Sequence, residues 1–157
     1  MLIKEATLED LAAIAHIGGK FFVESGWIKN LTPSKENTYK SLLAMMEDPD
    51  YCIVAAYDDE GELGGFVMAG LGNPWSVEKV AVEELFFTNP NGSGYGIAKP
   101  MLDFIEDMCK TKGAKLFYSS STASIDDDGK AARGFNILLR RNGWAEIPHA
   151  RVFMKEL

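Results

Sequence analysis

A glycine-rich segment is the part of this chain whose residue types and spacing point most directly to chemistry. Gly92, Gly94 and Gly96 lie between an apolar strand pattern that ends in Asn89-Pro90 and an apolar helical pattern that begins at Ile97. A helix start leaves backbone N–H groups unpaired, and glycine has no Cβ to keep a ligand away from the backbone. This arrangement predicts a site for a phosphate or pyrophosphate group.

Two adjacent carboxylates, Glu83 and Glu84, precede this segment in the apolar strand pattern. Successive side chains of a strand point to opposite faces, so we expect the two carboxylates on opposite sides of a covered sheet. An unpaired buried charge is costly, so at least one should face a polar cavity. A carboxylate in that position can accept a proton from a substrate.

The glycine spacing disfavours two familiar phosphate-binding loops. A P-loop needs a Gly-Lys-Ser/Thr triplet, which this chain lacks. A dinucleotide fingerprint needs a wider glycine spacing and an acidic residue about 20 residues further on. No acidic residue stands at 114–118. An ordinary glycine-rich turn between a strand and a helix is the alternative that needs no ligand.

The sequence Ser93-Gly94-Tyr95-Gly96-Ile97-Ala98 resembles the pyrophosphate-binding loop of the GNAT-type N-acetyltransferase superfamily, which reads Gln/Arg-x-x-Gly-x-Gly/Ala. That loop follows a strand often written Glu-Glu-Leu-Phe-Val, which is similar to residues 83–87. Residues 2–10 are similar to the family's first strand and helix entry, residues 138–144 to a later helix end, and residues 151–155 to its last strand. The resemblance thus covers nearly the whole chain.

This resemblance implies acetyl-CoA as the cofactor. Its pyrophosphate would rest on backbone N–H groups of the loop, and its pantetheine arm would follow the preceding strand, where a break in pairing frees backbone groups. The residues implied in cofactor binding are Leu85, Phe86, Phe87, Ser93, Gly94, Tyr95, Gly96, Ile97 and Ala98. The usual Gln or Arg of the loop's first position is replaced here by Ser93, a smaller hydrogen-bonding residue.

The resemblance also implies direct attack of an amine on the thioester. Glu83 matches the position of a catalytic carboxylate in some polyamine-acetylating relatives, so we expect it to be the general base. Glu84, a solvent-relayed base and purely structural glutamates are the alternatives. The tyrosine that often serves as general acid falls at Leu139, which cannot donate a proton. Tyr118 is the nearest suitable substitute, although a tyrosine in a buried strand is more typical of a core.

Acceptor-binding residues are expected around the first two helices, which wall the acceptor pocket in relatives. Phe22, Glu24 and Trp27 would offer an aromatic wall and a carboxylate. Such a combination suits an amine or a cation. The alternative is that the aromatic residues pack in the core at a helix end.

The length predicts one domain over residues 1–157, and the hydrophobic periodicity predicts a mixed α/β (α+β) fold. The resemblance implies a GNAT-type fold, whose central mixed sheet is mostly antiparallel and has about seven strands flanked by about four helices. Strands are expected at 2–6, 51–57, 63–71, 79–88 and 114–120, followed by two short closing strands. Helices are expected at about 8–23, 34–47, 95–112 and 129–142. We expect Thr7 with Asp10 to cap the first helix and Ser34 the second. Pro100 conflicts with the third helix unless that helix begins near Ala98 or bends.

Composition bounds the class of protein. The chain has 157 residues, 46% of them apolar and 25% charged, and it lacks a long apolar run or a leader pattern. We therefore expect a cytoplasmic protein without membrane contact. The formal net charge of −7 argues against a nucleic-acid surface. Cys52 and Cys109 stand in apolar segments away from other metal ligands, so we expect buried, reduced thiols and no metal site.

The function predicted is an N-acetyltransferase that moves an acetyl group from acetyl-CoA to an amine of a small molecule or peptide. A homodimer is compatible with this interpretation. Ser93 and Leu139 favour one alternative, a non-catalytic acyl-CoA-binding or interaction module with the same fold. A nucleotide-binding regulatory domain is a second alternative, which the glycine spacing disfavours.

Overall fold

The sheet is formed by strands of both orientations. The computed structural model of the protein describes residues 1–24, 32–73, 76–89, 94–119 and 130–145. Its elements are β1 (Leu2–Glu5), α1 (Leu11–Glu24), α2 (Lys35–Glu47), β2 (Tyr51–Tyr57), β3 (Leu63–Gly72), β4 (Lys79–Thr88), α3 (Gly94–Thr111), β5 (Ala114–Tyr118) and α4 (Lys130–Arg141). The described strands lie in the order β1-β2-β3-β4-β5; the first four are antiparallel, and β5 is parallel to β4. The predicted mixed α/β fold is confirmed, while the two closing strands fall outside the described residues.

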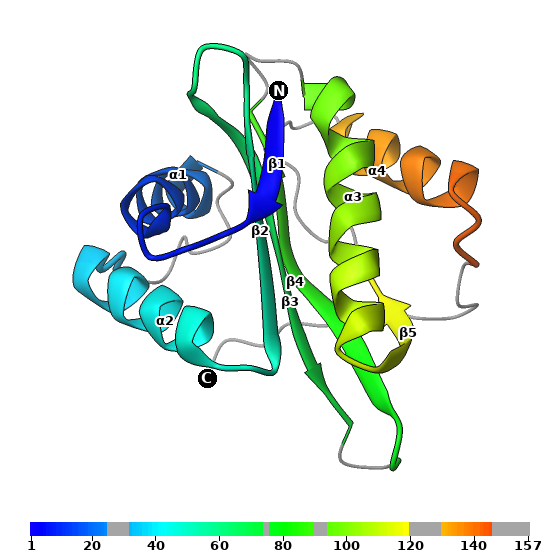
Figure 1. Ribbon diagram of the computed structural model, residues 1–157. Coiled ribbons are helices and arrows are strands. Elements are labelled where there is room, and N and C mark those ends of the chain that lie inside the picture. Colours follow the sequence, from blue (N-terminus) through cyan, green and yellow to red (C-terminus); the bar gives the residue numbers. More distant parts are fainter. Residues whose placement is uncertain (25–31, 74–75, 90–93, 120–129, 146–157) are drawn as a thin grey trace.

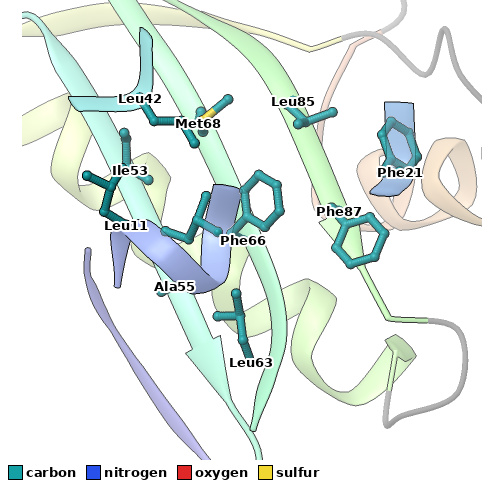
Figure 2. Packing of buried hydrophobic residues seen from close by; sticks show 11 residues of the cluster. Leu11, Phe21, Leu42, Ile53, Ala55, Leu63, Phe66, Met68, Leu85 and Phe87 are labelled. Carbon is teal, nitrogen blue, oxygen red and sulfur yellow. The ribbon is translucent and has the colours of Figure 1, made fainter. Parts of the chain in front are cut away.

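Helices cover both faces of the sheet (Figure 1). α1 and α2 lie on one face, and α3 and α4 lie on the other. Alternation along β2 divides the core in two, because Ile53 and Ala55 belong to the cluster beneath α1 and α2, whereas Cys52 and Val54 belong to the cluster beneath α3. Figure 2 shows the first cluster, with Phe66 among its labelled residues. Burial on both faces explains why these strands read as nearly continuous apolar runs.

The two helices on the first face begin differently. Ser34 caps α2 as predicted, since its side chain accepts a hydrogen bond from the backbone N–H of Asn37 at 3.2 Å. α1 begins at Leu11, later than the predicted start near residue 8, because residues 8–10 form a turn. In this turn the backbone N–H and the hydroxyl group of Thr7 both donate to Asp10, at 2.7 and 3.1 Å.

Asp10 is a buried carboxylate at the junction of β1, β2 and α1. It is only 3% exposed, its carboxylate lies 2.9 Å from Nζ of Lys4, and it accepts a hydrogen bond from the hydroxyl group of Tyr57. Burial alone would raise the pKa of Asp10, but the hydrogen bonds from Tyr57, Thr7 and Lys4 outweigh it and lower the pKa to about 2. Burial and the bond to Asp10 raise the pKa of Tyr57 to about 12.

Gly65 lies where α3 and β4 both come close to the backbone of β3. A Cβ on Gly65 would lie 2.7 Å from the carbonyl oxygen of Phe87 and 3.0 Å from the side chain of Met101. α3 begins at Gly94, close to the predicted start at about residue 95, so of the two ways to accommodate Pro100 the late start near Ala98 does not hold. Pro100 therefore lies within the helix, where it cannot donate to the carbonyl group one turn back.

Neither a membrane-spanning helix nor a metal-binding cluster is found within the described residues. No helix there is both long enough and apolar enough to cross a membrane. No group of three or more His, Cys, Asp or Glu side chains within the same residues could hold a metal ion.

Candidate functional site

Glu83 lies where β4 and β5 separate. The two strands pair as far as Val82 and Tyr118, and Tyr118 is the last residue of β5. The hydroxyl group of Ser119, the next residue, donates a hydrogen bond to Oε2 of Glu83. Glu83 is therefore the first residue of β4 beyond its last pair with β5. Its half-buried side chain is held across the opening between β4 and β5.

The backbone of β4 beyond Glu83 is suited to binding an extended ligand. Within the described residues, its edge towards β5 has no strand partner. The side chains of this part of β4 pack against other residues. Leu85 and Phe87 belong to the core beneath α1 and α2. The ring centroids of Phe86 and Phe135 in α4 are 4.6 Å apart. Recognition on this edge would therefore fall to the backbone N–H and C=O groups.

A β-bulge separates the two neighbouring carboxylates. Leu85 pairs with Met68 of β3, but the next pair joins Glu83 to Ala69, which leaves Glu84 as the extra residue. A bulge bends its strand and redirects side chains at such positions. The bulge therefore lies directly beside the point where β4 leaves β5.

Glu84 points back over β3 towards β2. Its Oε1 accepts a hydrogen bond of 3.0 Å from the hydroxyl group of Tyr51, and a Cβ on Gly70 would lie 3.1 Å from the same oxygen. Burial, followed by the bond and charge of Glu84, raises the pKa of Tyr51. Glu84 is exposed. Its hydrogen bond to Tyr51 holds the carboxylate towards β2, which is separated from β4 by β3 and lies away from the opening between β4 and β5.

The contacts of the two carboxylates lie on opposite faces of the sheet. Tyr51 lies two residues before Ile53 in β2, so its side chain points to the same face of the sheet, towards α1 and α2. Ser119 lies two residues after Phe117, so its side chain points to the same face as Phe117, which packs against the cluster beneath α3. Glu84 therefore faces the α1–α2 side and Glu83 the α3 side, as alternation along a strand predicts.

The start of α3 can present backbone N–H groups to an anion. Gly94 is its first residue, and the first turn contains no acidic side chain that would repel a phosphate. Ile97 and Ala98 are buried, so only their backbone could contact a ligand. Ser93 and the side chain of Tyr95 lie outside the described residues.

The two candidates for the general acid have different surroundings. Leu139 is 8% exposed and is part of the core, so it offers neither a proton nor an open position. Tyr118 is 40% exposed and is not the core residue that a strand tyrosine typically becomes. Because it alternates with Phe117, it faces the α1–α2 side, opposite to Glu83.

The predicted acceptor residues cannot be compared with the structure. Trp27 and the side chains of Phe22 and Glu24 lie outside the described residues. Their neighbour Phe21 is buried and meets the ring of Phe87 edge-on, with centroids 5.5 Å apart. At least this part of the aromatic segment packs in the core.

Tyr51 is the site residue that sequence reasoning missed. It is the first residue of an apolar strand and belongs to no recognisable motif. Its contact with Glu84 depends on the pairing of β2 with β3 and of β3 with β4. Glu84 is the extra residue of the bulge and its Oε1 passes close to Gly70, and neither relation can be found without the strand pairing.

Comparisons with known proteins agree with this geometry. A model of the acetyltransferase (GNAT) family matches residues 20–135. The chain belongs to the GNAT acetyltransferase family. Enzymes of this family take their acetyl group from acetyl-CoA, so the predicted cofactor is confirmed.

Solved structures of GNAT acetyltransferases share the fold. An aminoglycoside 6'-N-acetyltransferase from Acinetobacter haemolyticus is 17% identical with a TM-score of 0.69, covering 100% of this chain and 99% of that chain. A ribosomal-protein-alanine N-acetyltransferase from Brucella melitensis biovar Abortus is 15% identical with a TM-score of 0.69, covering 99% and 100%. An aminoglycoside N-acetyltransferase solved with CoA is 14% identical with a TM-score of 0.72, covering 99% and 95%. No curated protein matches the chain by sequence.

Proposed function

We propose that this chain is an N-acetyltransferase that transfers an acetyl group from acetyl-CoA to an amine of a small molecule or peptide, with Glu83 as the general base. The observation that carries the proposal is the position of Glu83, which Ser119 holds across the opening where β4 leaves β5. In this position a carboxylate adjoins an unpaired backbone edge of β4, and the next helix along the chain, α3, begins at Gly94.

The described residues fit the cofactor through their backbone. The N–H groups from Gly94 to Ala98 would hold a pyrophosphate, because the first turn of α3 contains no acidic side chain and Gly96 is exposed. The edge of β4 at Leu85, Phe86 and Phe87 would pair with the amide groups of a pantetheine arm. When bound, acetyl-CoA supplies the acetyl group as a reactive thioester.

The base assignment follows from where each carboxylate is held. Glu83 meets Ser119 at the opening itself, whereas Tyr51 draws the carboxylate of Glu84 over β3 and away from it. Glu83 would remove the proton of the incoming amine, directly or through a water molecule. A backbone N–H group beside the bulge would polarise the carbonyl group of the thioester.

The acid step depends less on a side chain. Tyr118 is exposed at the end of β5 and could protonate the leaving sulfur, while Leu139 cannot. A thiol has a pKa of about 8.5, so a thiolate is a tolerable leaving group near neutral pH and solvent can supply the proton. We therefore expect Tyr118→Phe to slow transfer without abolishing it.

A non-catalytic acyl-CoA-binding module is the competing function, and the buried Leu139 at the usual tyrosine position favours it. The decisive assay measures coenzyme A release from acetyl-CoA against a panel of amines. The panel should include polyamines and amino acids, and also aminoglycosides and peptides with N-terminal alanine, because structural neighbours are named for those acceptors. Tight binding of acetyl-CoA without release for any amine would favour the module.

Glu83→Gln tests the base, and Glu84→Gln is its matched control. Loss of a general base should lower kcat by about 10²–10⁴-fold, while the affinity for acetyl-CoA, measured by calorimetry, stays close to that of the wild type. Glu84→Gln should have the smaller effect on kcat. Equal turnover by both variants and the wild type would show that the base lies elsewhere.

A further inference from the structure

Two cysteine thiols from different elements meet beneath α3. Cys52 in β2 is 0% exposed and Cys109 in α3 is 1% exposed. Both belong to the core cluster between the sheet and α3. Neither has a place in the acetyl-transfer chemistry, because α3 starts at the candidate site and Cys109 lies near its other end.

The last turn of α3 fixes this meeting point. Lys112, three residues after Cys109, donates hydrogen bonds to the backbone carbonyl groups of Tyr51 at 2.6 Å and Pro49 at 3.2 Å. Cys52 directly follows Tyr51, so these hydrogen bonds hold the end of α3 close to Cys52. A hydrogen bond joins the two thiol groups.

The two thiols differ in acidity. The hydrogen bond with Cys109 lowers the pKa of Cys52, burial opposes this, and the charge of Lys112 lowers it further. The same bond and burial raise the pKa of Cys109. Cys52 is thus the thiol that ionises first, and Cys109 lies beside it as a second thiol.

We propose that Cys52 and Cys109 form an oxidation site that closes to an intramolecular disulfide when the protein meets a peroxide. The Cys52 thiolate attacks one oxygen of hydrogen peroxide, the O–O bond breaks, and a sulfenic acid and one water molecule result. The sulfur of Cys109 then attacks the sulfenic sulfur, and the hydroxyl group leaves as a second water molecule. Two thiols lose two hydrogens in total, and peroxide is reduced to two water molecules.

The disulfide would join β2 to the end of α3 across a long segment of the chain. Cross-links of this kind stabilise a fold mainly by restricting its unfolded state. The oxidised protein should keep its fold and unfold at a temperature higher by about 10 °C. The native protein should also react more slowly than urea-unfolded protein, because both thiols are buried in the folded chain.

The test treats the full chain with hydrogen peroxide, removes the oxidant, unfolds the protein without reductant and adds N-ethylmaleimide. Intact-mass spectrometry should find a monomer that has lost two hydrogens and takes up no maleimide, and dithiothreitol should restore two maleimide additions. Cys52→Ala and Cys109→Ala should each fail to give this product, and Cys109→Ala should accumulate oxygen adducts on Cys52.

Three results would overturn the proposal. Two maleimide additions after oxidation would show that the thiols stay free, and a disulfide-linked dimer would show that they pair between chains. A native product that melts at the same temperature as the reduced protein would show that no internal cross-link has formed. All three readings come from the wild-type chain, so they hold even if an alanine variant fails to fold.

Discussion

Replacing Asp10 by asparagine should destabilise the protein by an amount that depends on pH. Asp10 is 3% exposed, and its hydrogen bonds with Tyr57, Thr7 and Lys4 lower its pKa from 3.8 to about 2 despite burial. Because each tenfold change in proton affinity is about 1.4 kcal/mol, this fall corresponds to about 2.5 kcal/mol of unfolding free energy near neutral pH. Asparagine cannot accept the same charge-assisted bonds, so the variant should lose a similar amount.

The sign of the pH dependence follows from a carboxylate whose folded-state pKa is lowered. Its stabilisation is present above about pH 4 and disappears as the pH falls towards about 2, because the unfolded chain binds the proton first. Urea unfolding of the wild type and Asp10→Asn should therefore give a free-energy gap that is widest near pH 7 and narrows below about pH 4.

A matched control separates this effect from a general cost of removing a charge. Asp103→Asn also breaks an ion pair, with Lys99 at 2.6 Å, but the Asp103 side chain is 51% exposed. Its effect on the unfolding free energy should stay below about 0.5 kcal/mol. A gap for Asp10→Asn that is constant from about pH 7 to about pH 2.5 would refute the assignment of a lowered pKa.

Three other variants test separate features of the fold and site. Gly65→Ala should lower the unfolding free energy by about 1–3 kcal/mol, since its Cβ would meet the carbonyl oxygen of Phe87. The control Gly72→Ala, whose Cβ would meet nothing within 4 Å, should leave thermal unfolding nearly unchanged. Gly96→Asp should abolish coenzyme A binding in calorimetry while circular dichroism stays native; tight binding by the folded variant would exclude this loop. Ser34→Ala should lower the unfolding free energy by about 1 kcal/mol through loss of the α2 cap, and an unchanged urea midpoint would contradict that role.

The order of the elements could be predicted because local patterns determine it. The apolar run of β2 and the capping residue Ser34 are visible within a few residues of sequence, and both agree with the structure. The start of α1 was placed too early because Thr7 and Asp10 form a turn whose hydrogen bonds resemble a helix cap. Choosing between those two geometries requires knowing that Lys4 and Tyr57 also bind Asp10.

The candidate site could be predicted only in part. The glycine-rich segment and Glu83 are contiguous with recognisable patterns, so their neighbourhood was evident from the sequence. The contacts that distinguish Glu83 from Glu84 were not, because each depends on a residue brought close by strand pairing, Ser119 in one case and Tyr51 in the other. The same holds for Cys52 and Cys109, which look unrelated until β2 lies beneath α3.

The bulge at Glu84 makes the presence of a residue there matter more than its identity. The bulge puts Glu84 and Leu85 on the same face of the sheet; if Glu84 instead paired with Met68 in regular alternation, Leu85 and Phe87 would turn towards α3, and Phe86 would leave its neighbour in α4 for the opposite core. Many side chains could therefore replace Glu84 at the cost of one hydrogen bond. Deleting Glu84 would leave Glu83 opposite Ala69 and Leu85 opposite Met68 in regular pairing, so both halves of β4 would keep their faces, while the bend beside the opening to β5 would be lost.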